Sequence, residues 1–288
     1  MDVPAAANAA AIHALMWTPC AVSPGKIIIE KILDVPGVRD CPIMGNNLPL
    51  IIVSHGGGSD PIVHHDTAEK LADAGFVVVA LRHPNDSAGG VDNSWFIERP
   101  TDVQRVLDYA LRSSPAAEKI DPSRIGFFGF SRGGYTGLML AGAIADYPFW
   151  LKSWIHMAVW AFHPDMPIQP SARDLRFKAF VIADPVTLFP DRESLRNVTA
   201  PLQLWSSQSG GQGVTPEKVA AVARDLPTKP EFHLVPNSTH SSFGMPCPAT
   251  VAKVAGDFCA DPPGFDRAAF HQQFDAQVLA FFSKNLPE

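Results

Sequence analysis

The stretch Arg124-Ile-Gly-Phe-Phe-Gly-Phe-Ser-Arg-Gly-Gly134 decides the fold of this 288-residue chain. Its apolar first half is typical of a buried strand, and Gly129-Phe-Ser-Arg-Gly133 matches the pattern G-x-S-x-G. Residues 132–145 are small, apolar and helical in character. Between a strand and a helix, this pattern predicts a sharp turn that lifts Ser131 above the sheet edge as a nucleophile, with glycines where side chains would clash. The alternative is a glycine-rich structural turn.

Strand-like and helix-like runs alternate along the rest of the chain. Runs typical of strands cover residues 27–33, 48–53, 76–81, 177–183, 202–205 and 231–235. Helical spacing of apolar residues covers residues 60–74, 101–112, 215–225 and 266–284. We therefore expect an α/β fold with a mainly parallel central sheet and helices on both faces. Length alone would allow two domains, but this alternation predicts one domain over residues 1–288, with a lead-in at 1–25 and a cap-like insertion at 146–172.

The composition excludes several classes of protein. Hydrophobic residues make up 46% of the chain and charged residues 18%, which provides a large apolar core and excludes intrinsic disorder. The net charge of −6 argues against a nucleic-acid partner and against an anionic membrane surface. No apolar run approaches the roughly 20 residues of a membrane span, so we expect no stable membrane insertion.

The four cysteines leave the redox state and the compartment open. Cys20 can pair with Cys41, and Cys247 with Cys259, while four free buried thiols are the alternative. A disulfide would imply an oxidising compartment. The first lysine is Lys26, so the N-terminus lacks the basic region of an intact signal peptide. We expect a periplasmic or secreted protein if a signal peptide has been removed, and a cytoplasmic one otherwise.

A glycine loop after an earlier strand forms a second part of the candidate site. The loop Ser54-His-Gly-Gly-Gly58 follows the strand-like run 48–53. Because glycine loops expose their backbone N–H groups, we expect the amides of Gly57 and Arg132 to form an oxyanion hole, with Gly58 also contacting the substrate. The alternative is a tight turn in which His55 only packs.

A serine nucleophile needs a histidine base. His240 lies in a loop after the last strand-like run, whereas His233 lies within that run and His271 lies on a predicted helix. A loop position lets a base reach Ser131, so we expect His240 to be the base.

The histidine in turn needs an acid that orients it. The segment after the strand-like run 202–205 holds no carboxylate, but the preceding run ends at Asp184. Open α/β sheets place their sites at the carboxyl ends of their strands, so we expect Asp184 to be the acid. Asp165 and Asp191 are the rivals, and a turn-capping role for Asp184 is the alternative.

The insertion at 146–172 is rich in aromatic residues and proline. We expect it to line an apolar substrate pocket, with Trp154, Trp160 and Phe162 contacting the substrate, rather than to serve only as core.

His64 and His65 suggest a metal site at first sight. Adjacent residues of a helix point about 100° apart, so these two histidines do not chelate one ion together. We expect no metal and no organic cofactor.

Taken together, these residues resemble α/β-hydrolases of the group that contains bacterial "predicted dienelactone hydrolases" and plasma-type platelet-activating factor acetylhydrolases. The resemblance covers roughly residues 48–284 and lies in the motifs Ser54–Gly58, Arg99-Pro-Thr-Asp102, Arg124–Gly134, Ala183-Asp184 and Thr239-His240. It implies the α/β-hydrolase fold and an acid one strand earlier than usual, as at Asp184. The tail from Cys247 to Cys259 also resembles secreted bacterial members.

Two positions depart from the group. Dienelactone hydrolases use a cysteine nucleophile, whereas position 131 is serine, so that activity is not implied. The residue after the nucleophile is Arg132, where many relatives have an apolar residue. Its side chain either steers an anionic substrate group or, as we favour, pairs with a nearby carboxylate.

The sequence thus predicts a serine hydrolase that cleaves small-molecule esters of short to medium, apolar acyl groups, in the manner of lipases and platelet-activating factor acetylhydrolases. The alternatives are an amidase or acyltransferase with the same residues and a binding protein of the same fold without turnover. The oligomeric state stays open.

Overall fold

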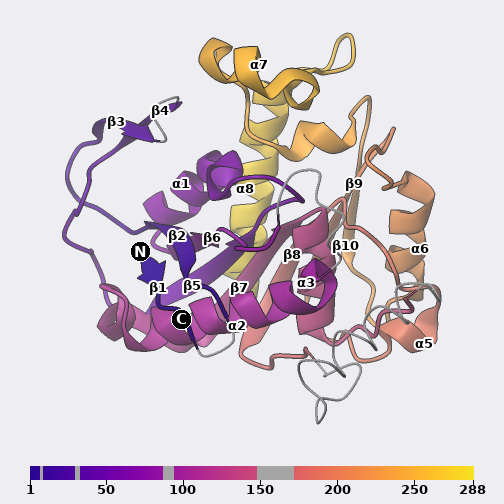
Figure 1. The fold of residues 1–288 in the computed structure, drawn as a ribbon, viewed down its shortest axis with the longest axis horizontal. Helices are drawn as coiled ribbons and strands as arrows, with labels where there is room; N and C mark the ends of the chain where they lie inside the picture. Colours follow the sequence, from indigo (N-terminus) through magenta and orange to yellow (C-terminus); the bar gives the residue numbers. More distant parts are fainter. Residues whose placement is uncertain (7–8, 30–32, 87–93, 148–171) are drawn as a thin grey trace.

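A central sheet crosses the molecule in the computed structural model, which describes residues 1–6, 9–29, 33–86, 94–147 and 172–288 (Figure 1). Its strands are β1 (Asp2–Val3), β2 (Ile12–Trp17), β5 (Leu48–Ser54), β6 (Val77–Leu81), β7 (Ile120–Phe130), β8 (Phe177–Ala183), β9 (Leu202–Ser207) and β10 (Glu231–Val235). Within the described residues they lie in the order β1-β2-β6-β5-β7-β8-β9-β10. Only the pairs β1–β2 and β2–β6 are antiparallel, so the sheet is mainly parallel, as expected.

Helices cover both faces of this sheet. They are η1 (Pro61–His64), α1 (His65–Asp73), α2 (Trp95–Arg112), η2 (Ala117–Lys119), α3 (Arg132–Ala141), α5 (Arg192–Leu195), α6 (Pro216–Asp225), η3 (His240–Phe243), α7 (Ala249–Ala255), η4 (Gly256–Cys259) and α8 (Arg267–Asn285). α2, α3 and α6 share one apolar core with the sheet, and α1 and α8 share another on the opposite face. Strands β5 and β6 are buried along their whole length, as parallel strands between two helical layers should be. None of the helices in the described part of the chain is long and apolar enough to cross a membrane.

The first 40 residues differ from the sequence-based expectation. Residues 1–25, expected as a lead-in, contribute β1 and β2 to one edge of the sheet. The run 27–33 was expected as a strand, and its described residues belong to two strands, β3 (Gly25–Ile29) and β4 (Leu33–Gly37), which form a separate two-stranded ribbon. This ribbon has its own small core, in which Leu33 and Val35 pack with Met245. Strand-like periodicity does not say which sheet a strand joins.

Helix α2 begins six residues before the expected position, and Pro100 lies inside it. A proline has no backbone N–H, so the carbonyl four residues earlier, that of Phe96, loses its helical partner. The hydroxyl of Tyr135 on α3 donates to this carbonyl at 3.3 Å. A contact from another helix thus satisfies the group that Pro100 leaves free, and the helix continues through the proline.

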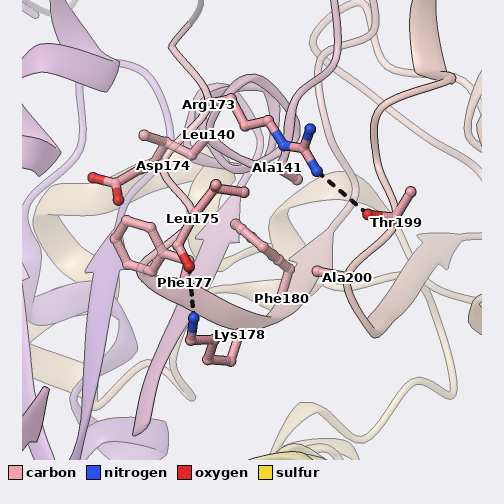
Figure 2. A pocket seen from close by; sticks show the side chains of 10 residues that line it. All are labelled: Leu140, Ala141, Arg173, Asp174, Leu175, Phe177, Lys178, Phe180, Thr199 and Ala200. Atoms are coloured by element: carbon pink, nitrogen blue, oxygen red, sulfur yellow. Dashed lines mark hydrogen bonds between the residues drawn. The ribbon is translucent and has the colours of Figure 1, made fainter. Parts of the chain in front are cut away.

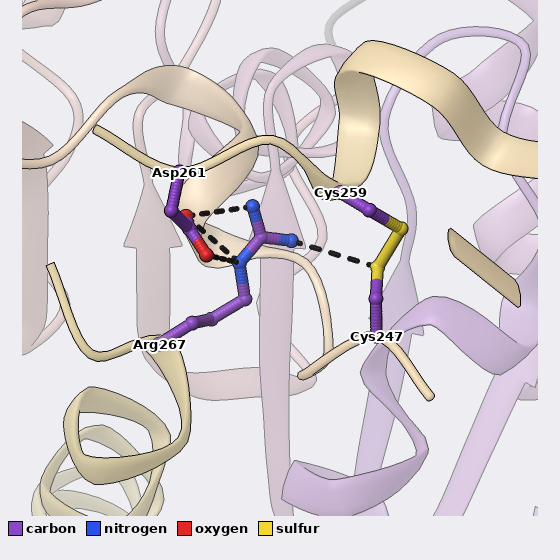
Figure 3. Close-up of a disulfide and its surroundings, with 4 residues drawn as sticks. All are labelled: Cys247, Cys259, Asp261 and Arg267. Carbon is purple, nitrogen blue, oxygen red and sulfur yellow. Dashed lines mark hydrogen bonds and ion pairs between the residues drawn. A yellow bond between two sulfur atoms is a disulfide. The ribbon is translucent and has the colours of Figure 1, made fainter. Parts of the chain in front are cut away.

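Both cysteine pairs form disulfides: Cys20 with Cys41, and Cys247 with Cys259. The second lies beside an ion pair between Arg267 and Asp261, and one guanidinium nitrogen of Arg267 also contacts the sulfur of Cys247 (Figure 3). The disulfide therefore closes the tail around α7 on itself, and Arg267, the first residue of α8, holds the closed tail through its contacts with Asp261 and Cys247.

Buried polar groups join α1 to α8. His271 on α8 donates from Nδ1 to Asp66 at 2.6 Å and from Nε2 to the carbonyl of Ser242 at 3.0 Å. Burial lowers the pKa of His271, but the hydrogen bond and the negative charge of Asp66 outweigh burial and raise it above 6.5 overall. One turn further on, Asp275 accepts a 2.6 Å hydrogen bond from the hydroxyl of Thr67. Burial, and then the charge of Asp66, raise the pKa of Asp275 to about 7.

Removing either disulfide should destabilise the fold. The bridges span 12 and 21 residues, and loops of this size correspond to about 3 kcal/mol of unfolded-state entropy each. We expect the double variants C247A/C259A and C20A/C41A each to lower the free energy of unfolding by about that amount in urea titrations. Unchanged unfolding midpoints, or free thiols in the denatured, unreduced wild type, would contradict this.

The proton held by Asp275 should make stability depend on pH. The folded state keeps this proton up to about pH 7, whereas the unfolded chain releases it near pH 3.8. Between these values unfolding releases a proton, so the free energy of unfolding falls as the pH rises. The variant Asp275→Asn keeps an acceptor for Thr67 and does not titrate. Between pH 4 and 8 its free energy of unfolding should gain about 4 kcal/mol relative to wild type. The exposed Asp73→Asn on α1 is the control, and parallel pH profiles for wild type and Asp275→Asn would refute the role of this proton.

Candidate active site

Ser131 sits at the turn between β7 and α3 in a strained backbone conformation. Its φ is 57° and its ψ is −115°, values that residues with side chains seldom adopt. The flanking glycines are sterically required, because a Cβ at Gly129 would overlap the carbonyl of Gly133, and a Cβ at Gly133 would overlap the carbonyl of Ser54. The turn therefore has the geometry that the G-x-S-x-G pattern predicts.

Hydrogen bonds to the neighbouring chain hold this turn in place. The backbone N–H of Ser131 donates to the carbonyl of Ala183 at 3.0 Å, and the N–H of Val186 donates to the carbonyl of Ser131 at 3.0 Å. Both partners flank the end of β8, which lies next to β7 in the sheet. These contacts fix Ser131 beside Asp184.

The structure brings Ser131, His240 and Asp184 into one hydrogen-bonded chain. The Nε2 atom of His240 lies 2.9 Å from Oγ of Ser131, and its Nδ1 atom lies 2.8 Å from a carboxylate oxygen of Asp184. The three side chains come from the carboxyl ends of β7 and β8 and from η3, which follows β10. All three are buried, and Asp184 is inaccessible to solvent. The ring of Phe130 covers one side of His240, with 4.6 Å between ring centroids.

Ser207 holds the carboxylate of Asp184, a contact that sequence reasoning missed. Its backbone N–H donates to one oxygen of Asp184 at 2.9 Å, and its hydroxyl donates to the other at 2.7 Å. Ser207 ends β9, where the sequence offers no carboxylate. A serine after a strand is too common for its position alone to have revealed this role.

Asp191, one of the two rival acids, has another role in the structure. Asp191 caps helix α5, because its carboxylate accepts a hydrogen bond from the backbone N–H of Ser194 at 2.9 Å. Asp165 lies outside the described residues, and so do Trp154, Trp160 and Phe162 of the expected cap.

The glycine loop lies against the serine turn. A Cβ at Gly56 would touch Phe130 and Ser131, and one at Gly57 would overlap the side chain of Arg132. The amide of Arg132 opens α3 and so has no acceptor within the helix. Gly57 in the loop and Arg132 at the start of α3, the two residues whose amides we expected to form the oxyanion hole, are thus adjacent. Gly58 follows Gly57 and has a φ of 62°.

His55 belongs to the loop's internal bonding. Its Nδ1–H donates to the carbonyl of Gly56 at 2.6 Å. Burial, and then the positive charge of Arg99, lower the pKa of its ring to about 3, so it is neutral at pH 7. His55 is thus a buried, neutral side chain that bonds within the loop.

A buried charge cluster lies behind the loop. Asp86 forms ion pairs with both Arg99 and Arg132. Burial alone would raise the pKa of Asp86, but the charge and hydrogen bond of Arg99 together with the charge of Arg132 outweigh burial, and the pKa is lowered. The guanidinium of Arg132 also lies 4.6 Å from the ring centre of Trp95, a cation–π contact. The side chain of Arg132 therefore pairs with a carboxylate, as we favoured, while the roles of Asp86 and Arg99 had no sequence signal.

Aromatic side chains of α2 and α3 gather next to Arg132. Trp95 stacks on Phe96, and both rings meet Tyr135 edge to face. The hydroxyls of Tyr135 and Tyr147 lie 2.8 Å apart. Tyr147, the last described residue before 148–171, thus lies beside this aromatic group.

A cavity of about 230 Å³ lies away from these residues (Figure 2). It is lined by Leu140 and Ala141 at the end of α3 and by Phe177 at the start of β8. Ser131 and Asp184 follow the opposite, carboxyl ends of the strands, so this cavity is not part of the candidate site.

Within the described residues, one group of side chains has donor atoms close enough to hold a metal ion: Asp66, His271 and Asp275, within 4.8 Å of one another. Its atoms are already engaged, since His271 bonds Asp66 and Ser242, and Asp275 accepts from Thr67. We interpret the group as the polar joint between α1 and α8 rather than as a metal site.

Comparisons with known proteins support the fold. No family model matches the chain. It is 30% identical over 108 residues to a probable 1-alkyl-2-acetylglycerophosphocholine esterase of Arthroderma benhamiae, a match that covers 31% of this chain and about a quarter (26%) of that protein. It also resembles the solved ferulic acid esterase of Streptomyces cinnamoneus, with a TM-score of 0.66 and 19% identity over 97% of this chain and 84% of the other. Together with the mainly parallel sheet and the helices on both faces, the structural match shows that this chain has the α/β-hydrolase fold.

Proposed function

We propose that this protein is a serine hydrolase of carboxylic esters. The observation that carries the proposal is the buried chain from Ser131 through His240 to Asp184, with contacts of 2.9 and 2.8 Å at the carboxyl edge of the sheet. A serine hydroxyl bonded to a histidine that is oriented by a carboxylate is the arrangement that activates serine for acyl transfer. Two similar proteins, a probable 1-alkyl-2-acetylglycerophosphocholine esterase and a ferulic acid esterase, support an ester substrate.

Each residue has a distinct role in this mechanism. Ser131 attacks the ester carbonyl while Nε2 of His240 accepts its proton and then passes it to the leaving alcohol. Asp184 accepts the Nδ1–H bond of His240, which fixes the ring and stabilises its cationic form. The amides of Gly57 and Arg132 stabilise the oxyanion. Water, deprotonated by His240, then cleaves the acyl-enzyme.

The substrate class follows from the surroundings of Ser131. The aromatic side chains of Trp95, Phe96 and Tyr135 lie on the side of the site where Arg132 packs. These rings are buried, and apolar surroundings of this kind support a small-molecule ester with a short to medium acyl group and an apolar body as the substrate.

The first prediction concerns the nucleophile. A fluorophosphonate probe should label the wild type and not Ser131→Ala, and hydrolysis of p-nitrophenyl butyrate should fall by about 10⁴-fold or more in that variant. Ser123→Ala, an exposed serine near the opposite end of β7, should behave as wild type. An unlabelled wild type, or equal labelling of Ser131→Ala, would sink the proposal and favour a binding protein.

The second prediction concerns the acid. Asp184→Asn should lower kcat by about 10³- to 10⁴-fold, because the amide no longer stabilises the cationic ring of His240. Asp191→Asn keeps a side chain that caps α5 and should retain the wild-type rate. Wild-type kcat in Asp184→Asn would show that another carboxylate is the acid, with Asp165 the next to test.

A further inference from the structure

Arg99 on helix α2 grips the glycine loop from behind. Its side chain is 1% exposed, and its two terminal nitrogens donate to the carbonyl of His55 at 2.7 Å and to that of Gly56 at 3.1 Å. Two consecutive carbonyls of the loop Ser54–Gly58 therefore face one guanidinium.

The hydrogen bond from Arg99 to the Gly56 carbonyl sets the direction of the Gly57 N–H. A trans peptide unit is planar, and its C=O and N–H bonds point in opposite directions. In the described part of the chain, which includes this loop, every peptide bond is trans. Because the Gly56 carbonyl points at Arg99, the N–H of Gly57 in the same peptide unit points away from Arg99. Glycines have no side chain to restrict this rotation, so the hydrogen bonds of the carbonyl supply the restriction.

A second hydrogen-bond chain runs from α2 to the start of the loop. The hydroxyl of Ser54 lies 2.9 Å from Nε2 of His83, and Nδ1 of His83 lies 3.0 Å from a carboxylate oxygen of Asp102. Asp102 is three residues after Arg99, on the same face of α2. All three members of this chain are buried, and burial lowers the pKa of His83 well below 6.5, so the ring is neutral.

Asp86 links Arg99 to Arg132, the residue that carries the other expected oxyanion amide. The carboxylate of Asp86 pairs with Arg99 and also with the side chain of Arg132, whose backbone N–H is the second expected donor. Removing the guanidinium of Arg99 would leave Asp86 paired with Arg132, but it would take one donor from each of the carbonyls of His55 and Gly56, and the Gly56 carbonyl would keep only the Nδ1–H of His55 among these donors.

We propose that Arg99 is a positioning residue that holds the Gly57 amide in the oxyanion hole, with the Ser54–His83–Asp102 chain as its second anchor on α2. The inference rests on the proposed ester hydrolysis and gives the Arg99-Pro-Thr-Asp102 motif a function. Arg99 touches no reacting atom and acts only through the loop.

The test separates transition-state binding from substrate binding. Arg99→Lys retains the charge but reaches one carbonyl, and Arg99→Met retains the bulk but donates to neither. We expect kcat per titrated active site to fall about 10-fold in the first and about 100-fold in the second, with KM within about twofold of wild type. The inhibition constant of a trifluoromethyl ketone, whose adduct with Ser131 places an oxyanion in the hole, should rise by the same factors. Ser54→Ala should show a smaller loss of the same kind.

Arg124→Lys is the matched control, because Arg124 also donates to two backbone carbonyls, those of Asn47 and Leu286, but at the other end of the sheet. It should keep kcat, KM and the inhibition constant. A merely structural role for Arg99 would lower the fraction of active sites and leave kcat per site unchanged, and that result would overturn the inference. So would a loss confined to KM with unchanged ketone inhibition. A wild type that neither hydrolyses the ester nor reacts with the fluorophosphonate would instead overturn the proposed function and this role with it.

Discussion

The close approach of α3 to β5 is the constraint on which the candidate site depends. Gly133 packs directly against the carbonyl of Ser54, where no Cβ fits. This contact brings the start of α3 next to the loop that leaves β5, so the amide of Arg132 and the loop at Gly57 become neighbours. The same turn forces Ser131 into a positive φ of 57°, which only surrounding hydrogen bonds sustain. Steric exclusion at one glycine thus arranges both the candidate nucleophile and its candidate amide donors.

Parallel strands bring the remaining groups to the same edge. Because β7, β8 and β9 run in one direction, their carboxyl ends meet, and Ser131, Asp184 and Ser207 follow these ends in turn. His240 arrives from the loop after β10 and completes the chain. Each strand contributes one group, and the sheet thereby brings together residues spread over 109 positions of the chain, from Ser131 to His240.

Sequence patterns predicted the features that local residues determine. The strands at 177–183 and 231–235 match the structure, and Ser131, His240 and Asp184 were named from their positions after strands. The sequence did not reveal Ser207, Asp86 or Arg99, because their roles arise from contacts between segments that local patterns do not connect. The early start of α2 was missed for the same reason, since a proline inside a helix is tolerated only when another element satisfies the freed carbonyl. The cap expected at 146–172 lies almost wholly outside the described residues and stays a prediction.

Pro100 makes helix α2 depend on a residue of helix α3. Its missing N–H leaves the Phe96 carbonyl to the hydroxyl of Tyr135, and that hydroxyl also meets Tyr147. A residue other than proline would return a helical donor to this carbonyl and compete with Tyr135, while losing Tyr135 would leave a buried acceptor unsatisfied. Positions 100 and 135 are therefore expected to covary among homologues. Since Arg99 directly precedes Pro100, substitutions at positions 100 and 135 would also move the side chain that bonds the glycine loop.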